Sequence, residues 1–588
     1  MRFEAQAIMA LMMPWPRRMC TSPTRTRVYP SSGFEAGRSR IDPTSDGRGS
    51  TAGSISAKHT LTAAIEQHPR RAFALFCALH ALVWTALPSV LYANLPLDLI
   101  EALTYGREWQ IGYDKLPPLP WWMIEIVHRL IGFDTAYYAL AQLAVIGAFA
   151  LVWWTARPLV GEIGALVAVL IIDGLHYFHF TAAKFNHDVI QLPLWALAGY
   201  SFHAALRRGR VLHWLLLGFA LGLALWAKYF VVVLALPLAL FLVFDREARK
   251  HLVTPGPWIA LAVALVVMMP HLVWLWNSDF LPFAYAERRA APSRGMIDHL
   301  VHPFVFALGQ FLFLLPSLLI AALLIWPRRS PPDRRAAKAP PLPYRGSSAD
   351  GFDRRVVTLL AFGPAATVIA LSALSGRGAI AMWGYPLWLF LGLWMVLRVP
   401  TAIEAARFAR IVAAWSAVFA IFALVFIANY SFLPLIDQRY RAPFFPGDRL
   451  ADELARRFRA ATGYPLAYVI GTMWEGGNVG HYAREHPRVL IDGDPRRAPW
   501  IDVGDLRSKG AVVVWTCAEN ARNKCNIDTT VVPIAFRGIG ADAQVQAPFA
   551  LPFRHGDMVL IVGWAILRPS PTFSMRYGKD LGLYSRLQ

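Results

Sequence analysis

The acidic side chains most suited to chemistry lie in a polar segment, residues 94–134, that follows the first long apolar run of the chain. Asp98 and Glu101 are three residues apart, so they share one face if this stretch is helical. Both lie where the apolar run ends, and an ionised carboxylate at such a place can accept a proton. Two interpretations stay open: a catalytic base, or a pair of acids that only solvate a helix end.

The same segment continues with Asp114 and Lys115, which add another acid and a basic side chain. The pair Pro117-Pro118 restricts the backbone directly after them. Trp121 then opens an apolar stretch whose aromatic start is typical of a helix at a membrane surface. This concentration of charge and rigid backbone favours a binding or catalytic site over a simple connection.

A second ionisable group lies between two apolar runs, at Lys184, Asn186, His187 and Asp188. Such groups are costly at membrane depth unless they are paired or face water, so they indicate a functional cavity. His187 and Asp188 are suitable ligands for a divalent metal, although two neighbouring ligands are too few to define a site. The alternative is a local ion pair with Lys184.

Isolated arginines in two further polar connections are candidates for binding a phosphate: Arg288 and Arg289 in one, and Arg377 in the other. The guanidinium group offers a planar fork of donors that matches phosphate oxygens. The alternative for Arg288 or Arg289 is contact with lipid headgroups. Lys228 lies between two apolar runs, where it either contacts the same phosphate or anchors a helix end, and anchoring is the favoured interpretation.

The composition places these residues in a membrane protein. Of 588 residues, 56% are hydrophobic and only 16% are charged, which is too apolar for an ordinary soluble protein. The net charge of +20 would fit a nucleic-acid binder, but the basic residues collect at one end of each apolar run, as membrane topology requires. The four cysteines form no CxxC pair and therefore indicate no zinc site.

Apolar runs of roughly 17–25 residues recur along a membrane domain at 71–440, and each is long enough to cross a bilayer as a helix. We expect spans at 72–93, 135–156, 162–179, 188–206, 211–227, 229–244, 256–276, 300–326, 355–374, 379–397 and 410–430. Residues 211–244 are the exception, because they could form one long pass. The predicted fold class is an α-helical polytopic membrane protein with about 11 spans.

Basic residues predict the orientation, since short cytoplasmic loops are rich in Lys and Arg. One side collects Arg70, Arg71, Arg157, Arg207, Arg208, Arg210, Arg246, Arg249, Lys250 and the stretches 328–355 and 398–410. This side is therefore expected to be cytoplasmic, with the Pro- and Arg-rich stretch 328–355 along the membrane surface. The polar segments that hold the candidate site residues then face the periplasm, together with the C-terminal domain.

The two ends of the chain differ from the apolar middle. Residues 1–70 are rich in Arg, Ser, Thr, Gly and Pro, which predicts a disordered basic extension, or a start codon assigned too far upstream. Residues 441–588 predict a small extracytoplasmic α/β domain. Its expected elements are a helix at 449–461 and strands at 467–470, 489–491, 511–514 and 558–562. Cys517 and Cys525 are near enough in sequence for a local disulfide in such a compartment.

The sequence GREWQIGYDKLPPLPWW at 106–122, with Asp98 upstream, resembles the first periplasmic loop of bacterial glycosyltransferase family 39. That family comprises C-type, membrane-embedded glycosyltransferases. It is related to protein O-mannosyltransferases and to the aminoarabinose transferase acting on lipid A. The resemblance covers 71–440 and includes the multi-span layout and the soluble tail, while residues 1–70 fall outside it.

The resemblance implies inverting transfer of a sugar from a polyprenyl-phosphate carrier to an envelope lipid, glycan or protein, at the periplasmic face of the inner membrane. It puts Asp98 in the place of the family's catalytic aspartate, acting as the base. The substrate-binding candidates are Glu101, Asp114, Lys115, Lys184, Asp188, Arg288, Arg289 and Arg377. Leu116 departs from the family, which often has a polar residue there, so a contact at that position is lost or the specificity differs.

The implied reaction needs no nucleotide at this step, and a divalent metal stays open as a cofactor. The expected partners are the lipid-linked donor, the envelope acceptor and membrane lipid, with no nucleic acid. The alternative function is a transporter or flippase for a lipid-linked sugar, but transporters often show internal repeats, and we see none. A noncatalytic envelope scaffold is a third hypothesis, and it would not require Asp98 and Lys115 individually.

Overall fold

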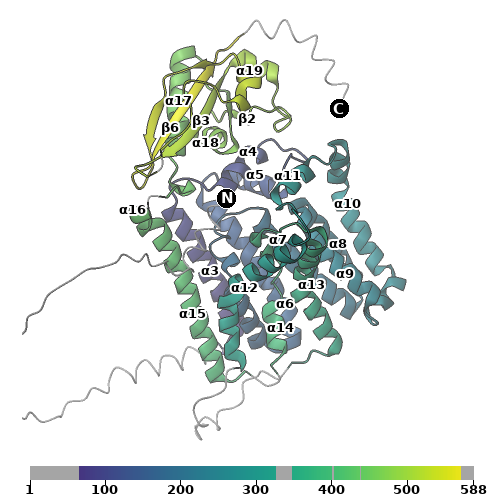
Figure 1. Ribbon diagram of the computed structural model, residues 1–588. Coiled ribbons are helices and arrows are strands. Elements are labelled where there is room, and N and C mark those ends of the chain that lie inside the picture. The colour runs from purple at the N-terminus through teal and green to yellow at the C-terminus, as the bar shows by residue number, and fades with distance from the viewer. Residues whose placement is uncertain are drawn as a thin grey trace, which may run out of the picture. The chain divides into compact units, whose positions relative to one another are not determined.

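The computed structural model describes residue 65 and residues 67–325, 347–399, 403–437 and 439–570, with residue 523 excepted. The predicted disordered extension therefore lies almost entirely outside the described residues, as does most of the Pro- and Arg-rich stretch at 328–355. The described chain comprises long helices followed by a C-terminal domain with a β-sheet (Figure 1).

Long apolar helices make up most of the described chain. Those with the length and composition to cross a membrane are α3 (Pro69–Leu91), α6 (Thr135–Asp173), α7 (His187–Arg208), α10 (Pro255–Asn277), α12 (Asp298–Ile325), α13 (Gly351–Ser375) and the run Ala405–Ile436, which begins as α15 (Ala405–Ile427). Two shorter apolar helices are α8 (Val211–Ala227) and α9 (Val232–Phe244). The predicted helical membrane fold is confirmed, and the number of spans stays a prediction.

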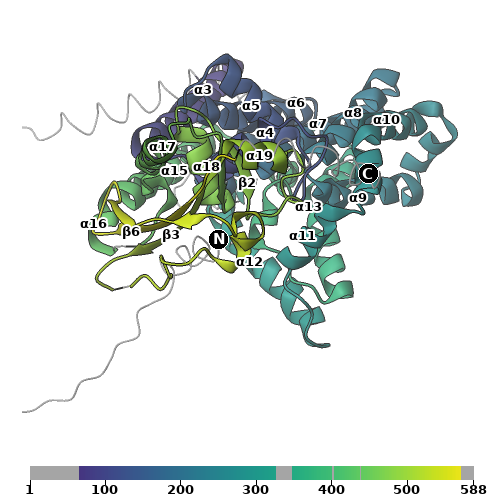
Figure 2. The same ribbon diagram turned by 90° about the horizontal axis from the view of Figure 1, so that it is seen from above.

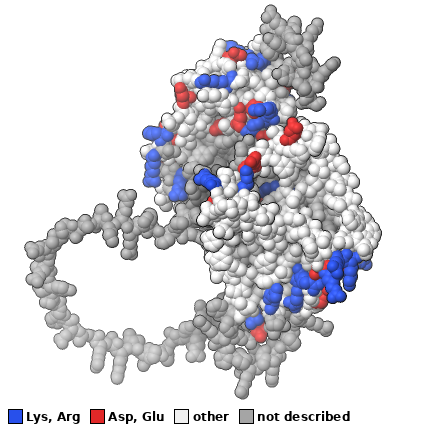
Figure 3. All heavy atoms as spheres, turned by 45° about the vertical axis from the view of Figure 1, so that its right-hand side comes forward, with Lys and Arg blue, Asp and Glu red and all other residues white. Residues whose placement is uncertain are grey.

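The surface of the helices is apolar, as expected of helices that face lipid. Exposed side chains include Leu75, Leu143, Val266 and Phe304. On the face shown in Figure 3, charged side chains form separate groups, and a broad surface of uncharged residues lies between them. This distribution agrees with a hydrocarbon belt between two polar boundaries.

Two predicted spans are not continuous helices. The span at 162–179 continues α6 across a kink at Gly161 (φ 70°), but the helix ends at Asp173, and residues 174–186 are irregular apart from a short 3₁₀ turn. The span at 379–397 is helical only in α14 (Leu391–Leu397), after the 3₁₀ turn η5 (Ala381–Gly384).

The two irregular segments lie against each other in the protein interior. The Tyr177 hydroxyl donates to the carbonyl oxygen of Ala381 at 2.6 Å, and the Gln142 amide donates to the carbonyl oxygen of Ala182 at 2.9 Å. Backbone without helical hydrogen bonds is tolerated at membrane depth only where protein or a water-filled cavity surrounds it. These side chains satisfy carbonyl groups that a regular helix would have paired, which explains why the two expected spans were wrong over these residues.

Short helices fold the polar segments that hold the candidate site residues. They are α4 (Leu97–Gly106), α5 (Leu119–Leu130) and α11 (Leu281–Arg289). Pro96 precedes α4, and Asp98 lies in its first turn, where the helix dipole favours a negative charge. Asp98 and Glu101 thus lie on one helix, as predicted. Pro118 precedes α5, and Pro120 lies in its first turn, a position where proline is well tolerated.

The C-terminal domain is a mixed sheet with helices. Its helices are α17 (Gly447–Thr462), α18 (Met473–Tyr482), α19 (Val503–Lys509) and α20 (Arg537–Gly540); its strands are β1 (Tyr468–Gly471), β2 (Arg488–Ile491), β3 (Ala511–Glu519), β4 (Gln544–Val545), β5 (Phe549–Pro552) and β6 (Val559–Leu567). The order is β2-β1-β3-β6-β4, with β5 also on β6. Strand β1 pairs parallel with β2 and β3, whereas β6 is antiparallel to its neighbours. The predicted helix and four predicted strands are confirmed.

Alternation along the strands separates two hydrophobic cores. Val512 and Val514 pack in a core shared with α17 and with the membrane helices. Val513 and Trp515 belong to a second core on the other face of the sheet. Figure 2 shows α17 and α18 on one side of β3 and β6. Cys517, on β3, and Cys525 are both free thiols, so the local disulfide is not formed.

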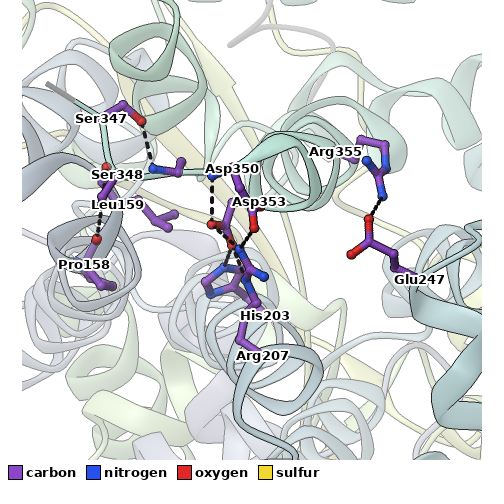
Figure 4. Close-up of polar contacts among 11 residues, drawn as sticks. Pro158, Leu159, His203, Arg207, Glu247, Ser347, Ser348, Asp350, Asp353 and Arg355 are labelled. Carbon is purple, nitrogen blue, oxygen red and sulfur yellow. Dashed lines mark hydrogen bonds and ion pairs between the residues drawn. The ribbon is translucent and has the colours of Figure 1, made fainter.

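A buried ion-pair network joins α7 to the start of α13 (Figure 4). Asp353 accepts hydrogen bonds from His203 at 2.8 Å and from two nitrogens of Arg207 at 2.6 and 2.7 Å. The Asp353 side chain is 5% exposed. Asp350 caps α13 by accepting from the Asp353 backbone at 2.9 Å. The network therefore fixes the position of two membrane helices at the end opposite to α4.

Replacing Asp353 by Ala is expected to destabilise the protein by about 2 kcal/mol, because Arg207 and His203 lose a buried partner; Arg207 is partly exposed, which reduces the loss below the usual cost of breaking a buried pair. Thermal unfolding in detergent measures the effect. Glu247→Ala is the control, since Glu247 pairs with Arg355 at an exposed position and should change stability by less than about 0.5 kcal/mol. Equal melting temperatures for both variants would contradict the role of Asp353.

Candidate active site

Asp98, in the first turn of α4, is held by two residues from the irregular segment before α7. Its Oδ2 atom lies 3.2 Å from Lys184 Nζ and accepts a 2.9 Å hydrogen bond from Asn186 Nδ2. The side chains of Asp98 and Lys184 are 19% and 16% exposed. The structure thus brings together the two polar segments that the sequence singled out separately.

Asn186 has two functions in this arrangement. Its Oδ1 atom accepts from the backbone amides of Asp188 and Val189 at 3.0 and 3.1 Å, which caps the N-terminus of α7. An Asn at this position is a favoured helix cap. Its Nδ2 atom remains to donate to Asp98. The cap therefore orients the amide that positions the Asp98 carboxylate.

The surroundings of Asp98 keep it ionised. Burial by itself raises the pKa of Asp98, but the charge of Lys184, the hydrogen bond from Asn186 and the charge of Lys115 outweigh burial and lower the pKa to about 2. A carboxylate that is stabilised in this way carries its negative charge at any physiological pH. It is also a weak base for as long as both lysines remain beside it.

Glu101, one turn further along α4, forms an ion pair with Lys115. The Lys115 ammonium also lies 5.3 Å from the centre of the Tyr285 ring on α11, a distance at which an aromatic face attracts a cation. Burial lowers the pKa of Lys115, but the carboxylate of Glu101 outweighs burial and raises it. Lys115 therefore stays charged beside Asp98.

Asp188 pairs with Lys228 at 2.6 Å, and Gln191 donates to the same carboxylate oxygen at 3.4 Å. The expected local ion pair with Lys184 is therefore wrong, because Lys184 reaches across to Asp98 instead. Lys228 lies at the C-terminal end of α8, so it does anchor a helix end, as the favoured interpretation had it. It does so by binding a carboxylate of the site.

His187 is buried and is held away from Asp188. Its Nε2 atom is 3.0 Å from the carbonyl oxygen of Pro117, and its ring packs edge-on against Trp121 on α5. The contact ties the start of α7 to the Pro117-Pro118 turn. His187 is therefore occupied structurally, and the described residues bring no third ligand to make a metal site with Asp188.

Asp114 connects the first polar segment to the C-terminal domain. It accepts hydrogen bonds from the Tyr105 hydroxyl at 2.7 Å and from Arg497 Nε at 2.8 Å. Arg497 also pairs with Asp492. A second contact of this kind joins Glu108 to Arg488. The loop that holds the site is therefore braced by the sheet domain.

Arg497→Met is expected to weaken this brace by about 1.5–3 kcal/mol, the usual contribution of hydrogen bonds to a charged group. The measurement is the melting temperature together with the rate at which a protease releases the C-terminal domain. Arg496→Met is the matched control, because the neighbouring Arg496 is 88% exposed. If both variants melted and were cleaved alike, Arg497 would not brace the loop.

The three predicted phosphate-binding arginines lie on or beside α11. Arg377 pairs with Glu287 at 2.8 Å, and both side chains are exposed. Arg289 ends α11, whereas the side chain of Arg288 lies outside the described part of the structure. No contact among the described residues ties Arg377 to Asp98, so its binding of a phosphate stays a prediction.

Sequence reasoning named Asp98, Glu101, Asp114, Lys115, Lys184 and Asp188, but it did not foresee how they pair. It also missed Tyr285 and Arg497. Arg497 lies in the stretch DGDPRRAPW, which carries no recognisable motif. Tyr285 immediately precedes the predicted arginine pair by a few residues, and its contact with Lys115 depends on the fold of α11.

Residues 115–274 match the model of a family described as dolichyl-phosphate-mannose-protein mannosyltransferase. Two lipopolysaccharide core galacturonosyltransferases of Rhizobium johnstonii are also similar. RgtA is 28% identical over 201 residues, which is 34% of this chain and 40% of RgtA, and RgtB is 28% identical over 198 residues, which is 32% of this chain and 39% of RgtB. The predicted family resemblance is confirmed. The match spans about two fifths of the length of these relatives.

The fold agrees with the same family. The crystal structure of ArnT from Cupriavidus metallidurans bound to undecaprenyl phosphate aligns with a TM-score of 0.52, at 13% sequence identity, over 83% of this chain and 97% of that chain. The apo structure of the same protein gives a TM-score of 0.51 over 85% and 98%. The chain thus has an ArnT-like fold of the C-type glycosyltransferases.

Proposed function

We propose that the protein is a glycosyltransferase that moves a sugar from a polyprenyl-phosphate carrier to an acceptor of the cell envelope. The reaction takes place at the periplasmic face of the bacterial inner membrane, where the C-terminal domain also lies. The observation that carries the proposal is the Asp98 carboxylate, which is held by Lys184 and Asn186 at a helix start beside Lys115. The similarity to two galacturonosyltransferases and to an undecaprenyl-phosphate-binding fold supports it.

The reaction is a single displacement. The acceptor oxygen or nitrogen attacks the anomeric carbon, Asp98 takes its proton, and the bond from that carbon to the phosphate oxygen breaks. The sugar is transferred with inversion, and polyprenyl phosphate leaves with the electron pair of the broken bond. A placed base typically contributes about 10²–10⁴ to such a rate.

Lysines supply the charge that the phosphate needs. The chain has nine lysines among 58 basic residues, and Lys115, Lys184 and Lys228 all pair with carboxylates of this site. When the donor phosphate binds, it competes with Asp98 for Lys184 and Lys115. Asp98 then loses the charges that lower its pKa, so it becomes a stronger base at the moment when the acceptor must be deprotonated.

Transfer from a panel of radiolabelled polyprenyl-phosphate sugars to extracted envelope acceptors tests the proposal. The full chain is used in nanodiscs, with a polyprenyl-phosphate galacturonic acid as the first donor. We expect label in the acceptor and release of polyprenyl phosphate in equal amounts. Label that crosses the bilayer while still attached to its lipid, with none transferred from any donor, would contradict the proposal and favour the flippase.

A further inference from the structure

A second group of ionisable side chains lies inside the helix bundle, away from the candidate active site. His80 is on α3, Asp173 is the last residue of α6, and His179 follows in the irregular segment 174–186. All three are 0% exposed. Ionisable residues at this depth are rare, and each one requires a partner.

The three side chains do not satisfy one another by hydrogen bonds. His80 Nδ1 lies 3.0 Å from Asp173 Oδ1, yet both of these atoms, the second ring nitrogen of His80 and Nδ1 of His179 have no hydrogen-bond partner in the described chain. Buried polar atoms are normally paired. Several unpaired atoms that converge on one point indicate a missing partner.

The spacing suits a metal ion. His179 Nε2 lies 3.5 Å from Asp173 Oδ1, and the three residues offer one ligand atom each within 4.8 Å of one another. Ligands that bind Zn²⁺ tetrahedrally at about 2.0–2.1 Å are about 3.3 Å apart. The two distances of 3.0 and 3.5 Å bracket that value.

The second carboxylate oxygen is already oriented. Trp415, on α15, donates from Nε1 to Asp173 Oδ2 at 2.6 Å. Hydrogen bonds to the outer atoms of metal ligands usually fix their direction in this way. The bond leaves Oδ1 directed at the two histidines. Among the described residues, the only ion pairs of Asp173 are those with His80 and His179.

We propose that His80, Asp173 and His179 bind a divalent transition-metal ion, with Zn²⁺ preferred, in the interior of the helix bundle. Two imidazoles and one carboxylate are a donor set that suits Zn²⁺. The ion joins α3, the end of α6 and the segment 174–186, which continues to Lys184 and Asn186 at Asp98. Its function is to hold this irregular segment in place, and the proposal stands independently of the transfer reaction.

Metal analysis of the tag-free full chain, purified in detergent without chelator, tests the proposal. We expect about one metal ion per wild-type chain and at least a tenfold loss in His80→Ala and Asp173→Asn. His213→Ala is the matched control, because His213 is also a buried histidine, on α8, and this variant should keep its metal. Retention of the metal by both cluster variants would overturn the proposal.

A measurement on the wild type avoids dependence on variants that fail to fold. Protein stripped with a chelator and reloaded with Co²⁺ should show visible ligand-field absorption that one equivalent of Zn²⁺ removes. We also expect the melting temperature to fall on stripping and to recover with Zn²⁺. A stripped protein that neither absorbs with Co²⁺ nor changes its melting temperature with Zn²⁺ would overturn the site.

Discussion

Asp98→Asn is expected to lower the turnover of sugar transfer by about 10²–10⁴, because the amide keeps the shape of the side chain but cannot take a proton. The fold should persist, since Asn is nearly the same size and Asn186 can still bond to its oxygen. The rate of label transfer, measured at saturating donor and acceptor, gives the turnover, and the melting temperature confirms that the variant is folded.

Asp134→Asn is the matched control for this variant. Asp134 lies in the same polar segment, directly before α6, and is exposed. It should retain close to wild-type turnover. Near-normal turnover by Asp98→Asn would exclude Asp98 as the base, and the flippase and scaffold hypotheses would then gain support.

Lys184→Met is expected to lower transfer by about 10²-fold, in line with the loss of one group that stabilises developing charge in a site shielded from water. It should also change the pH profile. In the wild type the pKa of Asp98 is about 2, so the base stays ionised between about pH 4 and 8. Without Lys184, burial is less opposed, and the pKa of Asp98 rises.

The sign of the pH effect follows from the base. Asp98 is inactive when protonated, so a raised pKa makes activity fall as the pH drops toward the new value, and the acid limb appears at higher pH than in the wild type. Lys228→Met is the control, because Lys228 pairs with Asp188 rather than with Asp98. The acid limb should stay in place there. An unchanged acid limb in Lys184→Met would show that Lys184 does not act on the base.

Much of the fold could be predicted from local sequence. Apolar runs predicted the long helices because burial in lipid requires a continuous stretch of apolar residues. Alternating apolar residues around Val512 and Val514 predicted the strands of the C-terminal domain. The breaks after Asp173 and before Leu391 could not be predicted in this way, because these stretches are as apolar as a helix. Tyr177 and Gln142, which pair the freed carbonyls there, lie elsewhere along the chain.

The site could be predicted by residue but not by contact. Asp98, Glu101, Lys115 and Lys184 stood out because charge at the end of an apolar run is costly without a function. The structure pairs Lys184 with Asp98 and Lys115 with Glu101, and this choice depends on how the irregular segment before α7 packs against α4. No local pattern encodes that packing.

The configuration of the transferred sugar tests the central claim most directly. A donor with a known anomeric configuration is supplied to the wild-type enzyme, and nuclear magnetic resonance of the purified product gives the configuration of the new bond. The account predicts inversion, because Asp98 acts as a base in one displacement and forms no bond to the sugar. A product with the donor's configuration would contradict it, since retention requires a second displacement.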